Sequence, residues 1–230
     1  MAQNLQVNGK RPSSKQSQYL ESLATDSPLF FGEGVFTTAK FIDGQIEYLS
    51  DHLERLQAHA AVLGFSVDIE PLRNIQSPFD VAKVKIIALR DMEPLVQISE
   101  CPLPPESPRL CVYPEPVLMP LARLKTISYL DRLWLKRFAE KRGFYDCITT
   151  DDKGYILETS RANIFWIEGD TLYYPDPELP YLFGIQLKNI IKEARMKTKA
   201  VKAKIEDIPK NAAIYICNCL IGKQATKIVP

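Results

Sequence analysis

The stretch LKTISYLDRLWLKRFAEKRGFYDCITTDDKGYILETSRANIFW (residues 124–166) combines a helical pattern with β-hairpin patterns. Residues 131–144 repeat apolar side chains at helical spacing, which predicts an amphipathic helix. Residues 145–157 form two apolar segments around a turn at 152–154, and residues 164–175 repeat this arrangement. We therefore expect one helix followed by two hairpins.

Six mostly polar residues, ETSRAN at 158–163, join these two hairpins. One interpretation is a solvated loop, because burying the carboxylate of Glu158 without a partner is costly. The other is a functional carboxylate at a strand end, which faces a buried protonated nitrogen and raises the pKa of that nitrogen. Spacing alone favours the loop and leaves the second interpretation open.

The first half of the chain predicts strands around a single helix. An Asn-Gly turn at 8–9 predicts an opening hairpin, and residues 34–50 predict two strands joined at a turn over 43–44. Residues 51–65 have helical periodicity, with Asp51 as the expected N-cap. Further strands are expected over 81–90, 95–100 and 109–114.

A proline-rich segment separates the two halves of the chain. Seven prolines lie from Pro102 to Pro120, and this density excludes a long helix. We place a domain boundary here, with lobes over 1–115 and 116–230. Beyond the opening stretch, residues 184–197 predict a helix. The remaining strands are expected over 200–206, 213–220 and 225–230. The chain therefore predicts an α+β fold with a smaller N-terminal lobe and a larger, strand-rich C-terminal lobe.

Composition excludes several classes of function. Lys+Arg of 29 against Asp+Glu of 28 gives a net charge of +1, without the basic signature of a nucleic-acid or membrane-surface protein. No apolar run reaches 18 residues and no secretion signal is recognisable, so we expect a cytoplasmic protein. Five dispersed cysteines indicate reduced, packed thiols. With only His52 and His59 available, no metal site is expected.

Two helices carry weak signals of binding. Gly184 opens a predicted helix, so the free N–H groups of residues 185–186 lie at its positive end, as at nearly every helix N-terminus. Arg55 lies with His52 and His59 in a polar stripe of the first helix. Such a stripe is typical of a solvated face.

Two further residues attract attention because of their neighbours. Asn218 interrupts the apolar strand 213–220 and needs a hydrogen-bond partner if it is buried, although strand asparagines are more often structural than ligand-binding. Lys125 lies between Leu124 and Ile127, just before a helix. A catalytic amine needs burial or a cationic neighbour to lower its pKa, and spacing alone does not distinguish it from a solvated lysine.

In their order and separation, four segments resemble the fold-type-IV enzymes that use pyridoxal 5′-phosphate. They are FGEGVFTTAKFIDGQIEYLSDHLERL, the 124–166 stretch, YLFGIQLKNII and YICNCL, and they extend from residue 31 to residue 220. This family includes branched-chain and D-amino-acid aminotransferases and 4-amino-4-deoxychorismate lyase. The resemblance implies a small-molecule substrate, pyridoxal 5′-phosphate as cofactor, and a homodimer with the site between the lobes.

The resemblance also implies cofactor roles, residue by residue. Lys125 matches the lysine that binds the cofactor covalently and acts as a general base. Glu158 matches the carboxylate that keeps the pyridine nitrogen protonated, and Arg55 matches an arginine that binds the phosphate. Ile185 and Gln186 match the main-chain amides at the same phosphate. The other residues expected in the cofactor site are Asn163, Asn218 and Cys219.

Three segments, GVFTTAKFIDG, LKTISYLDRL and YICNCL, are most similar to 4-amino-4-deoxychorismate lyase. That similarity implies cleavage of aminodeoxychorismate to 4-aminobenzoate and pyruvate, a step toward folate. On this expectation Thr38 positions or protonates the leaving side chain. The alternatives are a class IV aminotransferase acting on a D- or branched-chain amino acid, and a catalytically degenerate relative.

Two features depart from the family's pattern. The segment DMEPLVQI follows Arg90 where many members carry a longer glycine-rich loop near the substrate entrance. Arg90, Arg109 and Arg161 are therefore the candidates for binding substrate carboxylates. Arg161 stands where the family usually has a small residue close to the cofactor, and it could bind a carboxylate or point into a dimer contact.

Overall fold

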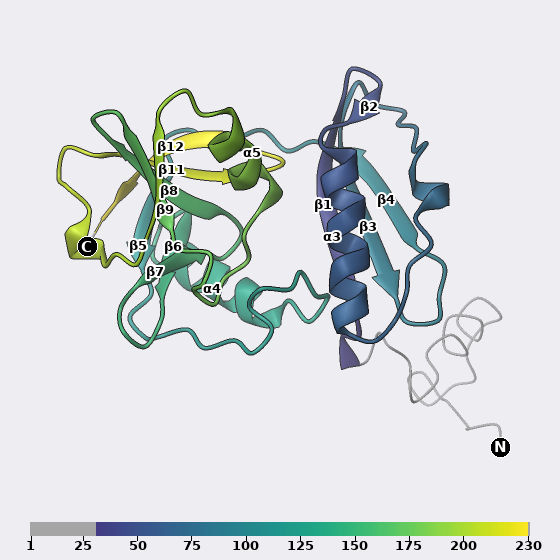
Figure 1. Cartoon of the computed structure of the whole chain (residues 1–230), viewed down its shortest axis with the longest axis horizontal. Coiled ribbons are helices and arrows are strands. Elements are labelled where there is room, and N and C mark those ends of the chain that lie inside the picture. Colours follow the sequence, from purple (N-terminus) through teal and green to yellow (C-terminus); the bar gives the residue numbers. More distant parts are fainter. Residues whose placement is uncertain (1–30, 230) are drawn as a thin grey trace.

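The strands divide between two sheets, and the computed structural model describes them over residues 31–229 (Figure 1). The opening hairpin expected at 8–9 lies outside the described residues. The two-lobed α+β fold is confirmed, with the smaller lobe first in the chain and the strand-rich lobe second. Within residues 31–229, no helix combines the length and apolar character needed to cross a bilayer.

The smaller lobe is a four-stranded sheet in the order β2-β1-β3-β4, with one long helix against it (Figure 1). Asp43 and Gly44 both have positive φ, so the expected turn after the first strand is confirmed. The elements are β1 (Gly34–Ile42), β2 (Gln45–Ile46), α3 (Leu49–Val62), the 3₁₀ helix η1 (Glu70–Leu72), β3 (Val81–Leu89) and β4 (Leu95–Glu100).

The two faces of this sheet have different partners because side chains alternate along β1 and β3. One face packs its apolar residues against α3 and forms the core of the lobe. The other face presents Phe36, Thr38, Lys83 and Lys85, all of which line a cavity. Thr38 and Lys85 are direct partners in the β1–β3 register.

The N-cap predicted for α3 is wrong. The cap residue is Tyr48, in the left-handed region with φ of 54°, and no side chain caps the helix. Asp51 lies in the first turn, where its carboxylate accepts a hydrogen bond from Lys188 of α5 (Ile185–Glu193) at 2.7 Å. The carboxylate of Asp51 therefore pairs with Lys188 of a distant helix and does not cap its own helix.

The larger lobe is an eight-stranded sheet in the order β10-β9-β8-β11-β12-β5-β6-β7. Ile148, Ile164 and Ile216 lie at the centre of its core. Its strands are β5 (Arg109–Val112), β6 (Asp146–Thr150), β7 (Ile156–Thr159), β8 (Asn163–Glu168), β9 (Thr171–Pro175), β10 (Lys197–Val201), β11 (Ala213–Asn218) and β12 (Gly222–Ile228). Its helices are α4 (Leu130–Glu140), α5 and the 3₁₀ helix η2 (Ile205–Asp207).

Both hairpins expected around the ETSRAN segment are present. β6 pairs antiparallel with β7, and β8 pairs antiparallel with β9. Their turns contain Gly154 at φ of 81° and Gly169 at φ of 54°, values that favour glycine. The helix expected over 131–144 is α4, which ends earlier, at Glu140.

The chain passes from one sheet to the other between Glu100 and Arg109. β5, at 109–112, pairs in parallel with β6 and β12 and so belongs to the larger sheet. The chain therefore enters the larger sheet before the domain boundary that we expected between residues 115 and 116. The proline-rich segment contains this strand as well as the connection, and prolines alone do not distinguish the two.

Candidate functional site

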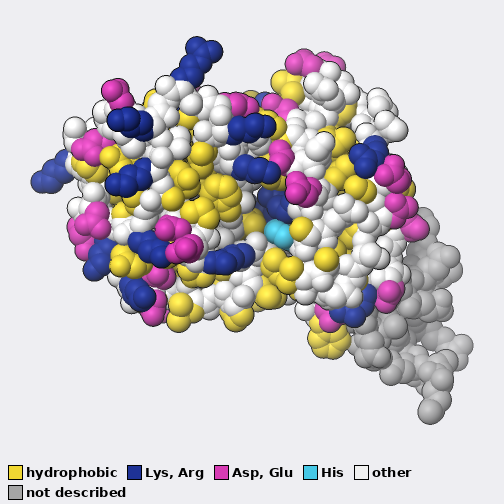
Figure 2. Space-filling view, in the orientation of Figure 1, with side chains coloured by type: hydrophobic (Ala, Val, Ile, Leu, Met, Phe, Trp, Pro, Cys, Tyr) yellow, Lys and Arg dark blue, Asp and Glu magenta, His cyan; other side chains and the backbone are white. Residues whose placement is uncertain are grey.

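The two lobes face each other across a cavity of about 580 Å³. Figure 2 shows a hollow between the lobes, with basic side chains and a histidine at its edge. The walls come from both lobes, so the site depends on how the lobes meet. Expected site residues that line the cavity are Thr38, Arg55, Lys125, Glu158, Arg161, Asn163, Ile185, Gln186, Asn218 and Cys219.

Lys125 lies in the connection to α4, and its main chain is held by the smaller lobe. Phe36 donates its N–H to the carbonyl of Lys125 at 2.9 Å, and Thr126 forms a β-bridge with Val35. The N–H of Lys125 donates to Nδ1 of His59 at 3.0 Å. These contacts fix the lysine backbone against β1 and α3, which leaves the side chain to the cavity.

The amine of Lys125 is in an environment that favours its neutral form. Burial lowers its pKa to about 7, and the nearby guanidinium groups of Arg55 and Arg132 contribute to the lowering. Its Nζ lies 4.8 Å from the ring centre of Phe36 and 5.6 Å from that of Tyr129. Near neutral pH this amine can therefore act as a nucleophile or a base.

Glu158 lies on β7 and is buried, as are all residues of the ETSRAN segment except Arg161. The interpretation of this segment as a solvated loop is therefore wrong. Oε1 of Glu158 accepts hydrogen bonds from Arg132 at 2.7 Å and from the N–H of Leu182 at 3.1 Å. Burial raises the pKa of Glu158, and the guanidinium of Arg132 opposes this.

Asn163 connects β8 to the start of α5. Its Nδ2 donates to the carbonyl of Leu182 at 2.8 Å, and its Oδ1 accepts from the N–H of Gly184 at 2.9 Å. A Cβ on residue 184 would lie 2.2 Å from that Oδ1, so only glycine fits here without a shift. The amide of Asn163 thus fixes where the helix begins.

One end of the cavity has the features of an anion site. α5 begins at Ile185, and both Ile185 and Gln186 line the cavity, at the positive end of the helix dipole. Arg55 of α3 donates from Nη2 to Oγ1 of Thr37 at 2.6 Å. Its Nε is buried and has no acceptor within residues 31–229, so a donor remains for an anion.

The polar stripe of α3 is not a solvated face. His52 is fully buried, with Nδ1 2.6 Å from Oγ1 of Thr37, to which Arg55 also donates. Nδ1 of His59 accepts from the N–H of Lys125. Burial lowers the pKa of His52 to about 3 and that of His59 to about 4. Both histidines are therefore neutral at physiological pH. Thr37 of β1 and the main chain of Lys125 thus supply partners for a stripe that an isolated helix would expose.

Asn218 finds the partners that its place at a strand end requires. Its Oδ1 accepts from the N–H groups of Leu220 and Ile221, at 2.9 and 3.1 Å, and its Nδ2 donates to the carbonyl of Arg161 at 3.2 Å. The asparagine therefore shapes the turn after β11. That turn holds Cys219 in the cavity wall, where burial raises the pKa of its thiol.

Of the three arginines considered for carboxylate binding, the structure brings only Arg161 to this cavity. Arg90 donates to the carbonyl of Leu63 at 3.1 Å, pairs with Glu33 at 3.3 Å and lines a separate open cavity. Arg109 bonds the carbonyl of Gly143 on the surface. Arg90 and Arg109 therefore do not reach a carboxylate in this cavity, because each is held by partners within its own lobe.

Several cavity residues were missed from the sequence, above all Lys83, Lys85 and Arg132. The two lysines alternate along β3, and this spacing could have placed them on one face with Thr38. Arg132 offered no comparable signal, since a polar residue on a predicted helix usually faces solvent.

Known proteins are similar to this chain in sequence and in fold. The family model described as amino-transferase class IV matches residues 34–228. A Vibrio harveyi aminodeoxychorismate lyase is 21% identical over 230 residues, covering 86% of this chain and 83% of the relative. A Methanocaldococcus jannaschii protein, provisionally named a branched-chain-amino-acid aminotransferase, is 23% identical over 250 residues, covering 97% of this chain and 85% of the relative.

Solved structures show the same fold. An aminotransferase from Brucella abortus, bound to the cofactor PLP, superposes with a TM-score of 0.76 at 20% identity, covering 87% of this chain and 83% of that one. The family assignment confirms the expected cofactor, pyridoxal 5′-phosphate. Because the family model spans nearly the whole described chain, this protein belongs to the amino-transferase class IV family.

Proposed function

We propose that this protein is a pyridoxal-phosphate-dependent lyase that cleaves 4-amino-4-deoxychorismate to 4-aminobenzoate and pyruvate. The observation that carries the proposal is a surplus of cations in the cavity. Lys83, Lys85 and Arg161 line it, and none of the three forms an ion pair within residues 31–229. A substrate with two carboxylates complements this charge. A branched-chain amino acid offers one carboxylate and an apolar side chain.

The cavity wall contains a group suited to each polar part of pyridoxal 5′-phosphate. Lys125 offers a buried amine to the aldehyde, and Glu158 offers a carboxylate to the ring nitrogen. The start of α5 and the unused Nε of Arg55 suit the phosphate. Asn163, Asn218 and Cys219 support the wall between these groups. These residues fit the cofactor, and we propose that they hold it.

Lys125 and Thr38 have separate roles in the proposed reaction. When bound, the cofactor supplies an electron sink for the electron pair left by a removed proton. Lys125 removes the proton from the amine-bearing carbon, because its low pKa makes the neutral amine available. Thr38 lies in the same wall and positions or protonates the leaving enolpyruvyl group. The C–O bond breaks, the ring becomes aromatic and the departing group gains a proton as pyruvate, so the atoms balance without a co-substrate.

A class IV aminotransferase acting on a D- or branched-chain amino acid is the second candidate. The apolar part of the cavity wall favours it, because Ile127, Leu133 and Leu220 could contact an aliphatic side chain. The name of the Methanocaldococcus jannaschii relative agrees with this candidate. A cavity of this kind also fits a relative that binds the cofactor without turnover.

Product analysis tests the proposal. The purified protein, reconstituted with pyridoxal 5′-phosphate, is incubated with aminodeoxychorismate, and pyruvate and 4-aminobenzoate are measured. A parallel incubation with branched-chain and D-amino acids and 2-oxoglutarate measures glutamate. Formation of both lyase products supports the proposal. Amino transfer without pyruvate release refutes the lyase and favours the second candidate, and no product in either assay favours the degenerate relative.

The expected homodimer and cytoplasmic location belong to the same proposal. Light scattering during size-exclusion chromatography measures the molar mass against the 26.1 kDa of one chain. A mass of twice this value supports the dimer, and a monomer contradicts it.

A further inference from the structure

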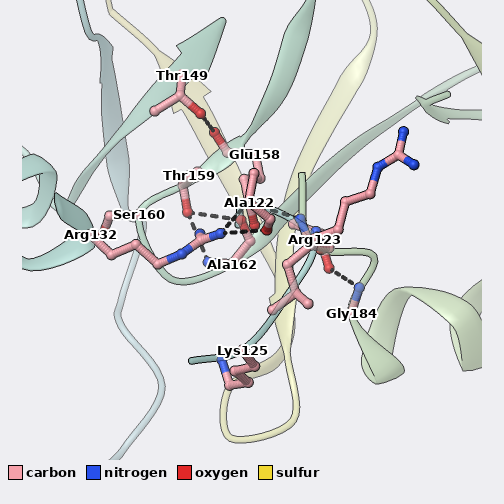
Figure 3. Close-up of polar contacts among 12 residues, drawn as sticks. Ala122, Arg123, Lys125, Arg132, Thr149, Glu158, Thr159, Ser160, Ala162 and Gly184 are labelled. Carbon is pink, nitrogen blue, oxygen red and sulfur yellow. Dashed lines mark hydrogen bonds and ion pairs between the residues drawn. The ribbon is translucent and has the colours of Figure 1, made fainter. Parts of the chain in front are cut away.

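A buried ion pair lies beside the cavity, between α4 and β7. Arg132 of α4 donates to Oε1 of Glu158 at 2.7 Å, and both side chains are more than nine-tenths buried. Arg132 also donates to the carbonyl of Ala122 at 3.2 Å, in the segment that leads to Lys125 (Figure 3). One guanidinium therefore connects the cavity carboxylate to the chain that carries the cavity amine.

The two oxygens of Glu158 have different surroundings. Oε1 accepts both protein hydrogen bonds, from Arg132 and from the N–H of Leu182. Oε2 accepts none within residues 31–229, and Glu158 is part of the cavity wall. The protein thus uses one oxygen to hold the carboxylate and leaves the other for a partner that enters the cavity.

Two cations favour the ionised form of Glu158, and Arg132 is the stronger of them. Lys125 is the other cation that acts on it, and Tyr181 is a neutral neighbour on the connection to α5. Tyr129 and Asp146 also act electrostatically on the guanidinium of Arg132. A buried carboxylate that loses its paired guanidinium ordinarily takes up a proton, because desolvation penalises the anion. The negative charge that faces the cavity therefore relies on Arg132.

We propose that Arg132 is a positioning residue that keeps Glu158 ionised and oriented, with Oε2 available to accept a hydrogen bond from the protonated ring nitrogen of the cofactor. The proposal rests on the proposed role of Glu158 toward the cofactor, and it holds for a lyase or an aminotransferase alike. Arg132 acts through Glu158 and need not touch the cofactor. A lysine at this position would keep the charge, while its ammonium would replace the guanidinium whose Nη2 makes both hydrogen bonds, to Glu158 and to Ala122.

Infrared spectroscopy of the full chain without cofactor tests the state of Glu158 directly. Arg132→Met is expected to show a protonated-carboxyl stretch at neutral pH that the wild-type protein lacks. The band should be absent from the double variant Arg132→Met/Glu158→Gln, which assigns it to Glu158. Arg132→Lys should keep the wild-type spectrum. If Arg132→Met has no such band while remaining folded by circular dichroism, Glu158 stays ionised alone and the proposal is overturned.

The second readout is the ¹⁵N chemical shift of ring-labelled cofactor bound to the full chain. The shift should indicate a protonated pyridine in the wild type and in Arg132→Lys, and an unprotonated pyridine in Arg132→Met. An unchanged shift in Arg132→Met overturns the proposal. If Arg132→Met fails to fold, Arg132→Gln removes the charge while keeping a side-chain donor. It should likewise give an unprotonated pyridine, and an unchanged shift in a folded Arg132→Gln overturns the proposal. Neither readout depends on product formation, so failure of the proposed reaction leaves this test intact.

Discussion

Replacing Gly184 with alanine tests the contact that fixes the start of α5. The backbone of Gly184, with φ of −76° and ψ of 149°, is open to any residue, so strain in the main chain does not arise. On that ground alone the change would stabilise the protein by roughly 0.5–1 kcal/mol, because alanine restricts the unfolded chain. The new Cβ, however, would lie 2.2 Å from Oδ1 of Asn163.

The cost of that collision follows from the bonds that Asn163 must give up. Its amide makes two buried hydrogen bonds, with Leu182 and with the N–H of Gly184. Each contributes about 1 kcal/mol, and a buried group left unpaired costs roughly 1 kcal/mol more. After the gain from the unfolded chain, we expect a net loss of about 2 kcal/mol from the free energy of unfolding.

Urea denaturation of a double-mutant cycle measures this loss and its cause. Gly184→Ala should destabilise the wild-type protein by about 2 kcal/mol. In an Asn163→Ala background the Cβ has room, and the same change should be neutral or stabilising by up to roughly 1 kcal/mol. An equal loss in both backgrounds would refute the reasoning, since the cost would not come from Asn163.

Three further predictions concern the cavity and its pH dependence. Lys125→Ala should lower kcat by roughly 100- to 10,000-fold and abolish the covalent cofactor absorption band, whereas the exposed control Lys199→Ala should change neither. Lys85→Ala should raise KM for a dicarboxylate substrate about tenfold with little change in kcat, because one charged hydrogen bond is worth roughly 1.5 kcal/mol; an unchanged KM excludes contact. His52 has a pKa of about 3 in the folded protein and about 6.5 in the unfolded chain. Its contribution to the free energy of unfolding is therefore complete above about pH 6.5 and is lost as the pH falls toward 3. Between pH 7 and 5 the wild type should lose about 2 kcal/mol more than His52→Gln by urea denaturation, and parallel losses contradict this.

Local signals in the sequence predicted the elements but not their tertiary partners. The turn at Asp43-Gly44 and the helical periodicity before residue 144 depend on neighbouring residues, and both appear as expected. The cap at Asp51 failed because Lys188, 137 residues away, takes the carboxylate. Helical periodicity reports which residues share a face, and it does not report what later covers that face.

The candidate site divides in the same way. The resemblance to a known family pointed to Lys125 and Glu158, which the structure brings to one cavity. It gave no indication of Arg132, whose partner lies 26 residues away on another element. Arg90 was expected in the cavity because it precedes the shortened loop. Its long side chain instead contacts the carbonyl of Leu63 and the carboxylate of Glu33, which hold it outside the cavity.

The stoichiometry of products tests the central claim most directly. Aminodeoxychorismate is supplied to the reconstituted protein with no 2-oxo acid present, and pyruvate and 4-aminobenzoate are quantified over time. The proposed function predicts equal amounts of the two products, formed through many turnovers and lost in Lys125→Ala. Turnover that occurs only when a 2-oxo acid is added, with no pyruvate released from aminodeoxychorismate, would contradict it.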